Sequence, residues 1–242
     1  MSDKSDQIYA TQQPFSPFQF DQKVAAVFAD MIKRSVPGYK DIIHTIQQLA
    51  SSYITQNSNA YDLGCSLGAA SLAMSYGNQN SRVEIIGVDN SKAMIDRCAA
   101  NIEGFKQQTP IKLVHDDIQQ IEIEKASMVV LNYTLQFIPQ PVRVSVLRRI
   151  YRGMRPGGIL VLSEKVVFED NTTDQLMIQL HHQFKRENGY SDLEISQKRN
   201  ALETVLIPES ITTHIDRLRN VGFSHVSSLQ QQLSFVSFIA IK

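Results

Sequence analysis

Apolar residues near the start of the chain repeat with the period of a helix. One apolar stripe predicts a helix over about residues 21–35, which Pro37-Gly38 ends. A second stripe predicts a helix over residues 39–54. We therefore expect residues 17–57 to form an N-terminal helical cap. Residues 1–16 are rich in Gln, Ser and Asp, which predicts a disordered or loosely docked tail.

From residue 60 the pattern alternates between short apolar runs and helical stretches. The runs predict five strands, at residues 60–64, 83–89, 111–116, 126–133 and 158–166. Helical patterns lie between several of them, at residues 68–76, 91–105 and 139–154. Near-continuous apolar strands separated by helices predict a parallel sheet that helices cover on both faces.

After the fifth strand the alternation stops. Residues from about 169 to 209 are polar and mostly helical in pattern, which predicts a helical insertion between strands five and six. A helix ending near Gly222 follows, and two closing strands are predicted at about 223–230 and 233–241. We expect an α/β fold in which residues 17–242 form a single domain around a Rossmann-like, mostly parallel sheet of seven strands.

Composition narrows the class of protein. A chain of 242 residues can bury one substantial core. Its 24 Lys and Arg balance 24 Asp and Glu, which argues against a surface built to coat nucleic acid or an anionic membrane. Two cysteines supply neither a disulfide framework nor a zinc site, and no apolar run approaches the ~18 residues of a membrane span. We expect a cytoplasmic protein without a metal.

Small and polar residues stand where the predicted parallel strands end, at the edge where open α/β sheets bind ligands. The first strand runs into the turn "DLGCSLG", residues 62–68, whose glycines allow a tight bend and close approach of a ligand. The turn lacks the G-x-G-x-x-G of nicotinamide dehydrogenases, and Ser66 replaces the middle glycine of D-x-G-x-G-x-G. A turn with only a structural role is the alternative. Cys65 has no evident partner base, so we expect it to offer its backbone.

The next three strand ends carry groups suited to a nucleoside. Asp89, followed by Asn90, could accept two ribose hydroxyls, or it could cap the following helix. Asp117 could accept the adenine amino group while Ile118 packs on the ring, or Asp117 could be a solvated loop carboxylate. Asn132 could bind the amino-acid part of a ligand, or its amide could bond to the backbone.

Four such features at four successive strand ends resemble the class I S-adenosylmethionine-dependent methyltransferase fold. The "RPGG" before the fifth strand is typical of that fold as well. The resemblance covers about residues 58–165 and 210–242. It implies seven strands of which the last is antiparallel, and S-adenosylmethionine as the ligand.

A closer resemblance spans nearly the whole chain apart from about the first 16 residues. It is to the carboxy-S-adenosyl-L-methionine synthase family, and it is carried by "FDQKVAAVFADMIKRSVPGY", "YDLGCSLGAA", "ASMVVLNYTLQF", "LSEK" and "HHQFKRENGYSDLEISQKR". The resemblance implies synthesis of carboxy-S-adenosyl-L-methionine from S-adenosyl-L-methionine and prephenate, with release of phenylpyruvate and water. It also implies that the product supplies the carboxymethyl donor for wobble uridine modification in bacterial tRNA.

The resemblance also implies a set of ligand-binding residues, which are Tyr39, Gly64, Cys65, Ser66, Asp89, Asn90, Asp117, Ile118, Asn132 and Arg199. Arg199 and Tyr39 would recognise the added carboxylate, because a guanidinium is a bidentate donor and a phenol supplies a hydroxyl. A homodimer is implied, in which Arg199 reaches the site of the neighbouring subunit. Without the resemblance, Arg199 would be assigned to a solvated face and Tyr39 to packing.

Other interpretations stay open at this stage. The pair His181-His182 lacks further ligands at suitable spacing, so helix packing or a dimer contact is favoured over a metal site. A conventional methyltransferase acting on a small molecule or tRNA would need no prephenate. A non-catalytic binder would hold the nucleoside without turnover. We expect no direct contact with nucleic acid and no membrane association.

Overall fold

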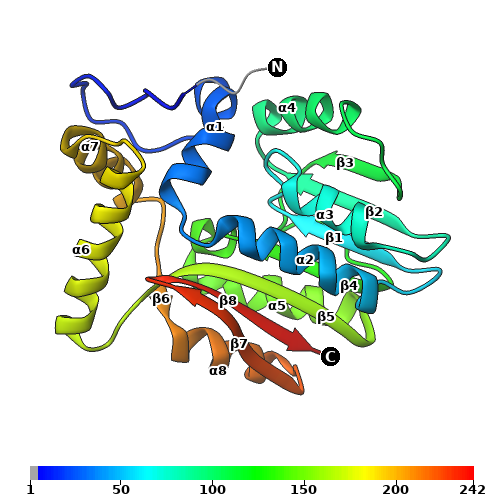
Figure 1. The fold of residues 1–242 in the computed structure, drawn as a ribbon. Helices are drawn as coiled ribbons and strands as arrows, with labels where there is room; N and C mark the ends of the chain where they lie inside the picture. The colour runs from blue at the N-terminus through cyan, green and yellow to red at the C-terminus, as the bar shows by residue number, and fades with distance from the viewer. Residues whose placement is uncertain (1–4) are drawn as a thin grey trace.

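The central sheet of the computed structural model, which describes residues 5–242, has the strand order β3-β2-β1-β4-β5-β8-β7 (Figure 1). The strands are β1 (Asn59–Leu63), β2 (Glu84–Asp89), β3 (Ile111–His115), β4 (Ala126–Asn132), β5 (Met154–Val167), β7 (His225–Gln232) and β8 (Phe235–Ile241). Strands β1 to β5 pair in parallel, and β8 runs antiparallel to both β5 and β7. The predicted mostly parallel sheet with an antiparallel last strand is confirmed. A two-residue strand, β6 (Glu209–Ser210), also pairs with β5.

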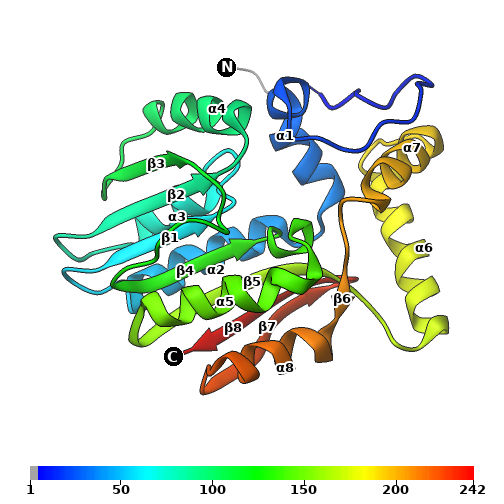
Figure 2. The same ribbon diagram turned by 180° about the vertical axis from the view of Figure 1, so that it is seen from behind.

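Helices cover both faces of the sheet, because alternate residues of each central strand point to opposite sides. On one face, Met128 and Val130 of β4 pack in a core with α2 (Tyr39–Tyr53) and α3 (Ala69–Gly77). On the other, Val129 and Leu131 pack with α5 (Gln140–Gly153) and α8 (Ile211–Val221). All four strand residues are fully buried. Figure 2 shows α5 and α8 on their side of the sheet.

The N-terminal helices divide their roles. The second one, α2, is a layer of the main core, since it buries Ile42, Ile46 and Ala50 against the sheet. The first one, α1 (Gln22–Ser35), lies beyond the carboxyl ends of the strands (Figure 1), whereas α4 (Lys92–Glu103) packs Cys98 and Ile102 against residues of β3. Only α1 therefore covers the ligand edge in the way that a cap is expected to do.

The predicted insertion contains α6 (Asn171–Glu187) and α7 (Asp192–Glu203), which stand at the same edge as α1 (Figure 1). Local sequence explains where these helices start. Asp170 accepts from the backbone N–H of Thr173, and Ser191 forms a reciprocal capping box with Glu194. Between them Gly189 adopts a φ of 85°, a left-handed conformation that favours glycine. No helix among the described residues has the length and apolar character needed to cross a membrane.

The N-terminal segment differs from a disordered tail where the structure describes it. Residues 1–4 of the predicted tail lie outside the described residues. Asp6, however, is only 2% exposed; it accepts a hydrogen bond from the Tyr190 hydroxyl and lies 3.6 Å from Lys198 Nζ. Its backbone N–H also donates to Asp30, at 2.7 Å. Composition could not show this, because the anchoring depends on cations that lie far away in the sequence.

Candidate functional site

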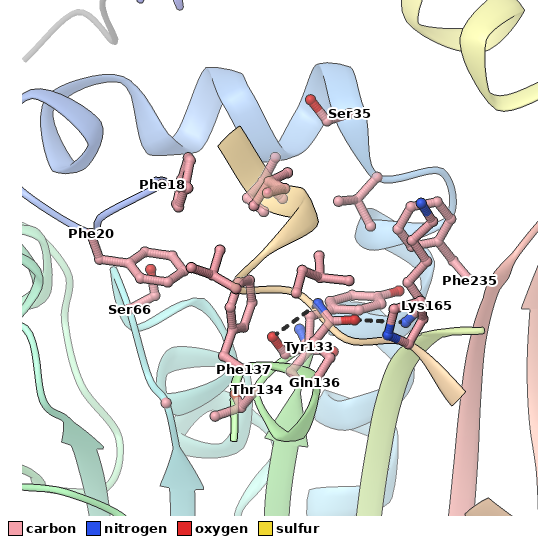
Figure 3. Close-up of a pocket in the computed structure, with 18 of the residues that line it drawn as sticks. Phe18, Phe20, Ser35, Ser66, Tyr133, Thr134, Gln136, Phe137, Lys165 and Phe235 are labelled. Atoms are coloured by element: carbon pink, nitrogen blue, oxygen red, sulfur yellow. Dashed lines mark hydrogen bonds between the residues drawn. The ribbon is translucent and has the colours of Figure 1, made fainter. Parts of the chain in front are cut away.

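A cavity of about 650 Å³ lies where the carboxyl ends of the parallel strands face α1, α6 and α7 (Figure 3). The structure brings all ten residues of the implied ligand set to its wall, namely Tyr39, Gly64, Cys65, Ser66, Asp89, Asn90, Asp117, Ile118, Asn132 and Arg199. They come from the ends of β1, β2, β3 and β4, from the start of α2 and from α7. Residues that are distant in sequence therefore share one site.

The turn after β1 is held by backbone hydrogen bonds and by close packing. Gly64 and Cys65 both donate their N–H to the carbonyl of Val88, at 2.8 and 2.9 Å. Gly64 has a φ of 83°, and a Cβ placed on it would lie 2.3 Å from Thr134 Oγ1. Ser66, the departure from the usual glycine pattern, adopts a φ of 50°. The turn thus keeps its left-handed bend without a glycine at that position.

Cys65 contributes structure rather than a reactive thiol. Its side chain is 4% exposed and packs beside the fully buried Cys98. The hydrogen bond with Cys98, followed by burial, raises the pKa of the Cys65 thiol above its usual range. A neutral thiol is a poor nucleophile. What this residue offers the cavity is therefore its backbone.

Asp89 is fixed in place with hydrogen-bonding capacity to spare. Its Oδ2 accepts from the N–H of Ser66 and its Oδ1 from the N–H of Ser91, each at 2.9 Å. Burial raises the pKa of Asp89, while these two backbone bonds lower it. The cap of α4 is Ser91, which accepts from the N–H of Met94, so Asp89 is not the cap. A carboxylate has about four lone-pair sites, so roughly two stay available to a ligand.

The ends of β3 and β4 present one occupied and one orphaned acceptor. Asp117 accepts from the backbone N–H of Gln119 at 2.8 Å, and Ile118 beside it is 6% exposed. Asn132 differs, because within residues 5–242 its Oδ1 is buried with no hydrogen-bond partner. Leaving such an acceptor unpaired costs about 1–3 kcal/mol. The orphaned oxygen is the mark of a position that a ligand donor completes.

The segment after β4 is a part of the site that the sequence analysis missed. Tyr133, Thr134, Gln136 and Phe137 all line the cavity (Figure 3). Buried Glu164 of β5 accepts from the N–H groups of Leu135 and Gln136, at 3.0 and 2.8 Å. The sequence signal that could have indicated this segment is Glu164, a carboxylate inside a largely apolar strand.

The charge of Glu164 is set by competing influences. Burial raises the pKa of Glu164 to about 8, while Arg143 and the two backbone donors act in the opposite direction. Arg143 is fully buried as well, and its guanidinium donates to the carbonyls of Ile138 and Gln136. The backbone of the cavity-lining segment is thus fixed by two buried side chains: Glu164 accepts from its N–H groups and Arg143 donates to its carbonyls.

Aromatic rings form much of the remaining wall, and only Tyr39 among them was predicted from the sequence. The rings of Phe20 and Phe137 meet edge to face with centroids 5.2 Å apart (Figure 3). Tyr133 lies between Tyr39 and Phe235, at 6.3 and 5.9 Å. Burial raises the pKa of Tyr39, which keeps its phenol neutral and able to donate. Phe18 and Phe20 of this wall belong to the cluster "FSPFQF" in an otherwise polar segment, which is the signal that could have revealed them.

The far end of the cavity is cationic. Lys165 of β5, Lys185 of α6 and Lys198 of α7 line it together with Arg199. Burial and neighbouring cations lower the pKa of Lys185 to about 7, and burial lowers that of Lys198 to about 8 despite Asp6. Burial also lowers the pKa of Lys165. None of these three lysines was given a role from the sequence. Lys185 and Lys198 lie on polar helices, where lysines are typical of a solvated face, and Lys165 stands near the end of the largely apolar strand β5.

Arg199 and the histidine pair complete this end. Arg199 is exposed and lines the cavity of its own chain, so its reach into a neighbouring subunit stays a prediction. His181 is buried, with Nε2 2.8 Å from the carbonyl of Ser35 and its ring 4.9 Å from that of Phe235. Burial lowers the pKa of His181 to about 2. These contacts are those of a neutral packing histidine. His182 also lines the cavity and is half-buried.

Solved structures of low sequence identity share the fold. A putative S-adenosyl-L-methionine-dependent methyltransferase from Methanococcus maripaludis matches with a TM-score of 0.62 at 21% identity, over 96% of this chain and 97% of that one. A putative O-methyltransferase from Nostoc punctiforme matches with a TM-score of 0.63 at 16% identity; it covers 91% of this chain, which spans 59% of that longer one. A family model described as a methyltransferase domain matches residues 60–158.

Sequence relatives are much closer. The carboxy-S-adenosyl-L-methionine synthase of Pseudoalteromonas translucida is 51% identical over 98% of both chains. The synthase of the same name from Shewanella sediminis is 52% identical over the full length of both. Identity at this level over the whole length includes the insertion and the N-terminal helices as well as the methyltransferase core. The chain belongs to the carboxy-S-adenosyl-L-methionine synthase family, on the class I methyltransferase fold.

Proposed function

We propose that this protein is a transferase that makes carboxy-S-adenosyl-L-methionine from S-adenosyl-L-methionine and prephenate, releasing phenylpyruvate and water. The observation that carries the proposal is the composition of the cavity, in which nucleoside-type groups at the strand ends meet a cluster of cations. Relatives of 51% and 52% identity bear the name of this synthase. A methyl acceptor for a conventional methyltransferase would not require so much positive charge.

The strand-end groups fit S-adenosyl-L-methionine. The free lone pairs of Asp89 suit the ribose hydroxyls, and Asp117 with Ile118 suits the adenine. The orphaned Oδ1 of Asn132 suits the ammonium group of the methionine part. The glycine turn brings backbone close to the ligand, and a Cβ at Gly64 would fill space that Thr134 already occupies.

The proposed reaction balances without an oxidant or a metal. A methyl C–H bond next to the sulfonium breaks and a C–C bond to the carbon of carbon dioxide forms. Prephenate supplies that carbon dioxide when its ring carboxylate leaves, its ring becomes aromatic and its hydroxyl departs. The departing hydroxyl takes up the proton that the methyl group gave, and leaves as water. Phe20 and Phe137 wall the cavity with apolar surface, which would limit the access of bulk water to the reacting carbons.

Arg199 and Tyr39 are proposed to recognise the added carboxylate. Arg199 offers a planar pair of donors and the neutral Tyr39 a hydroxyl. A charge-assisted hydrogen bond contributes roughly 1.5–3 kcal/mol. This corresponds to about a tenfold to hundredfold preference for the carboxylated ligand over S-adenosyl-L-methionine.

Mass spectrometry of the small molecule that leaves the purified protein on denaturation tests the proposal. The expected mass is that of S-adenosyl-L-methionine with one carboxyl group in place of a hydrogen. Incubation with S-adenosyl-L-methionine and prephenate should then yield phenylpyruvate in equal amount. Unchanged S-adenosyl-L-methionine after this incubation would overturn the proposal and favour a conventional methyltransferase or a non-catalytic binder.

We also infer a cytoplasmic homodimer whose product serves as the carboxymethyl donor for tRNA, without contact of this protein with nucleic acid or membrane. The zero formal net charge supports the last point. Mixing the inactive variants Arg199→Ala and Asp89→Ala tests the dimer. If Arg199 acts in the neighbouring site, hybrid dimers regain activity in one site of two. No recovery, in a mixture shown to exchange subunits, would assign Arg199 to its own chain.

A further inference from the structure

Three lysines meet at the cationic end of the cavity, and they differ in what balances them. Lys198 donates to Ser35 Oγ at 3.0 Å and lies 3.6 Å from the buried carboxylate of Asp6. The ammonium groups of Lys165 and Lys185 have no hydrogen bond or ion pair within residues 5–242. Lys185 is nevertheless only 7% exposed. Two lysine amino groups are therefore kept in the cavity wall without a counter-charge.

This arrangement is costly for the folded protein. Transfer of an ammonium group out of water is unfavourable unless an anion or several acceptors replace the solvent. The nearest other charges do not relieve it, since Lys198 and Arg199 are themselves cations that act on Lys185. Asp174 acts on Lys165 but is engaged with the backbone N–H of Phe168 at 3.0 Å. A bound anion is the partner that completes the pair.

The surroundings of the two lysines describe the anion. Figure 3 shows Lys165 beside Phe235 at one end of the cavity, away from Ser66 of the nucleoside turn at the other. The rings of Tyr133 and His181 lie on either side of Phe235, at 5.9 and 4.9 Å. Charge beside flat apolar surface suits a carboxylate carried on an unsaturated ring or its side chain.

We propose that Lys165 and Lys185 form a carboxylate-binding site for the second substrate, holding the carboxylate that this substrate keeps through the reaction. The assignment rests on the proposed function. A carboxylate that leaves as carbon dioxide loses its charge, so a cation paired with it would stabilise the reactant and slow the step. A cation paired with the retained carboxylate binds that group equally well before and after carbon dioxide is lost. The unpartnered lysines are therefore suited to the retained group, which is the carboxylate of phenylpyruvate.

Calorimetric titration of the protein loaded with S-adenosyl-L-methionine tests this site. Phenylpyruvate is the first probe, because it carries the retained carboxylate alone, and prephenate is the second. Lys185→Met and Lys165→Met should each weaken both probes by about tenfold to a hundredfold, as expected for the loss of a charge-assisted contact. Affinity for S-adenosyl-L-methionine should not change. The matched control is Lys106→Met, an exposed lysine outside the cavity, which should leave all three affinities unchanged.

The outcomes separate this inference from the proposed function. If both variants bind phenylpyruvate as tightly as the wild type does, the lysine site is wrong even when turnover with prephenate is observed. If the wild type binds phenylpyruvate in a lysine-dependent way but never reacts with prephenate, the site stands and the proposed function falls. If the wild type binds neither probe, both are overturned.

Discussion

The two ends of the cavity are built on different principles. At the nucleoside end, the fold itself positions the ligand groups: Asp89 is tied to two backbone N–H groups, and the glycine turn is locked against Val88 and Thr134. At the cationic end, long side chains from β5 and α6 bring charges that the described residues leave unbalanced. One end is organised before the ligand arrives, whereas the other needs the ligand to complete it.

This difference separates stability from function in a testable way. Changes at the nucleoside end should damage the fold or the affinity for every adenosyl ligand. Changes at Lys165, Lys185 and Arg199 of the cationic end should not destabilise the fold, because the described residues give these side chains no ion pair in the cavity, and should affect only ligands that carry an extra carboxylate. Four substitutions test this difference, in order of decreasing expected effect, and Lys198→Met serves as the counterpart of the fourth, Lys185→Met.

Gly64→Ala is expected to cause the largest loss, because two penalties combine. The residue has a φ of 83°, and the new Cβ would lie 2.3 Å from Thr134 Oγ1. The left-handed backbone costs about 1–2 kcal/mol and overpacking roughly 1–3 kcal/mol, so a total of about 2–5 kcal/mol of unfolding free energy is expected to be lost. Urea unfolding measures it. Gly157→Ala is the matched control, with a φ of 76° but nothing within 4 Å of the added Cβ.

The control isolates the clash from the backbone strain. Gly157→Ala should lose only about 1–2 kcal/mol, the cost of a left-handed conformation for an L-residue. Equal losses in the two variants would mean that the packing of the β1 turn against Thr134 contributes nothing.

Asp89→Ala should weaken all adenosyl ligands alike, by about a hundredfold or more if two charge-assisted bonds are lost. Direct binding of S-adenosyl-L-methionine and of its demethylated product measures the effect. Asp96→Ala, which removes an exposed carboxylate of α4 paired with Lys92, is the control and should bind normally. Unchanged affinity in Asp89→Ala would refute the ribose assignment.

The nucleoside end could be predicted from the sequence because its residues stand at the ends of apolar runs along the chain. Strand ends are found from the apolar runs, and parallel topology then brings Asp89, Asp117 and Asn132 to one edge. The start of β5 was the weakest boundary: the strand begins at Met154, four residues ahead of the predicted residue 158, because a residue outside the apolar run can still pair with β4. The short β6 has no period from which it could be predicted.

The cationic end could not be predicted in the same way. Lysines spaced along polar helices are typical of a solvated face, and nothing local shows that Lys185 is buried. Its burial depends on how α6 packs against α1 and β8, where His181 contacts Ser35 and Phe235, and such contacts form only in the folded chain. Asp6 is the clearest case, since its partner Lys198 lies on the far insertion. Charge balance between remote segments leaves no periodic signal.

Arg199→Ala should keep the fold and lose about tenfold to a hundredfold in affinity for the carboxylated ligand, the value of one charge-assisted contact. Because Arg199 is exposed, no stability change is expected. Ligand content after purification, measured by mass spectrometry, checks the first part. Arg186→Ala, an exposed arginine of α6 that does not line the cavity, should retain the ligand. Retention of the carboxylated ligand by Arg199→Ala would remove this residue from carboxylate recognition.

Lys185→Met is expected to stabilise the protein in the absence of ligand, by about 0.5–2 kcal/mol, because it removes a buried charge without a partner. The size of this gain in stability depends on pH. Burial lowers the pKa of Lys185 to about 7, whereas an unfolded lysine holds its proton to about 10.5. The destabilisation of the wild-type fold by the Lys185 charge is therefore complete below pH 7, and it shrinks as pH rises from 7 toward 10.5. Denaturant unfolding at pH 6 and pH 9 should show a smaller advantage of the variant at pH 9.

Lys198→Met provides the opposing comparison from the same cluster. Lys198 is as buried as Lys185 but lies beside the carboxylate of Asp6, so its removal leaves a buried acid without its cation. This variant should lose stability at pH 7, where Lys185→Met gains it. The sign of the change in unfolding free energy would then distinguish the two lysines: Lys198 stabilises the fold, whereas Lys185 binds a ligand. A gain of stability in both variants would show that Asp6 does not balance the charge of Lys198. All three lysines of the cavity would then be expected to bind the same anion.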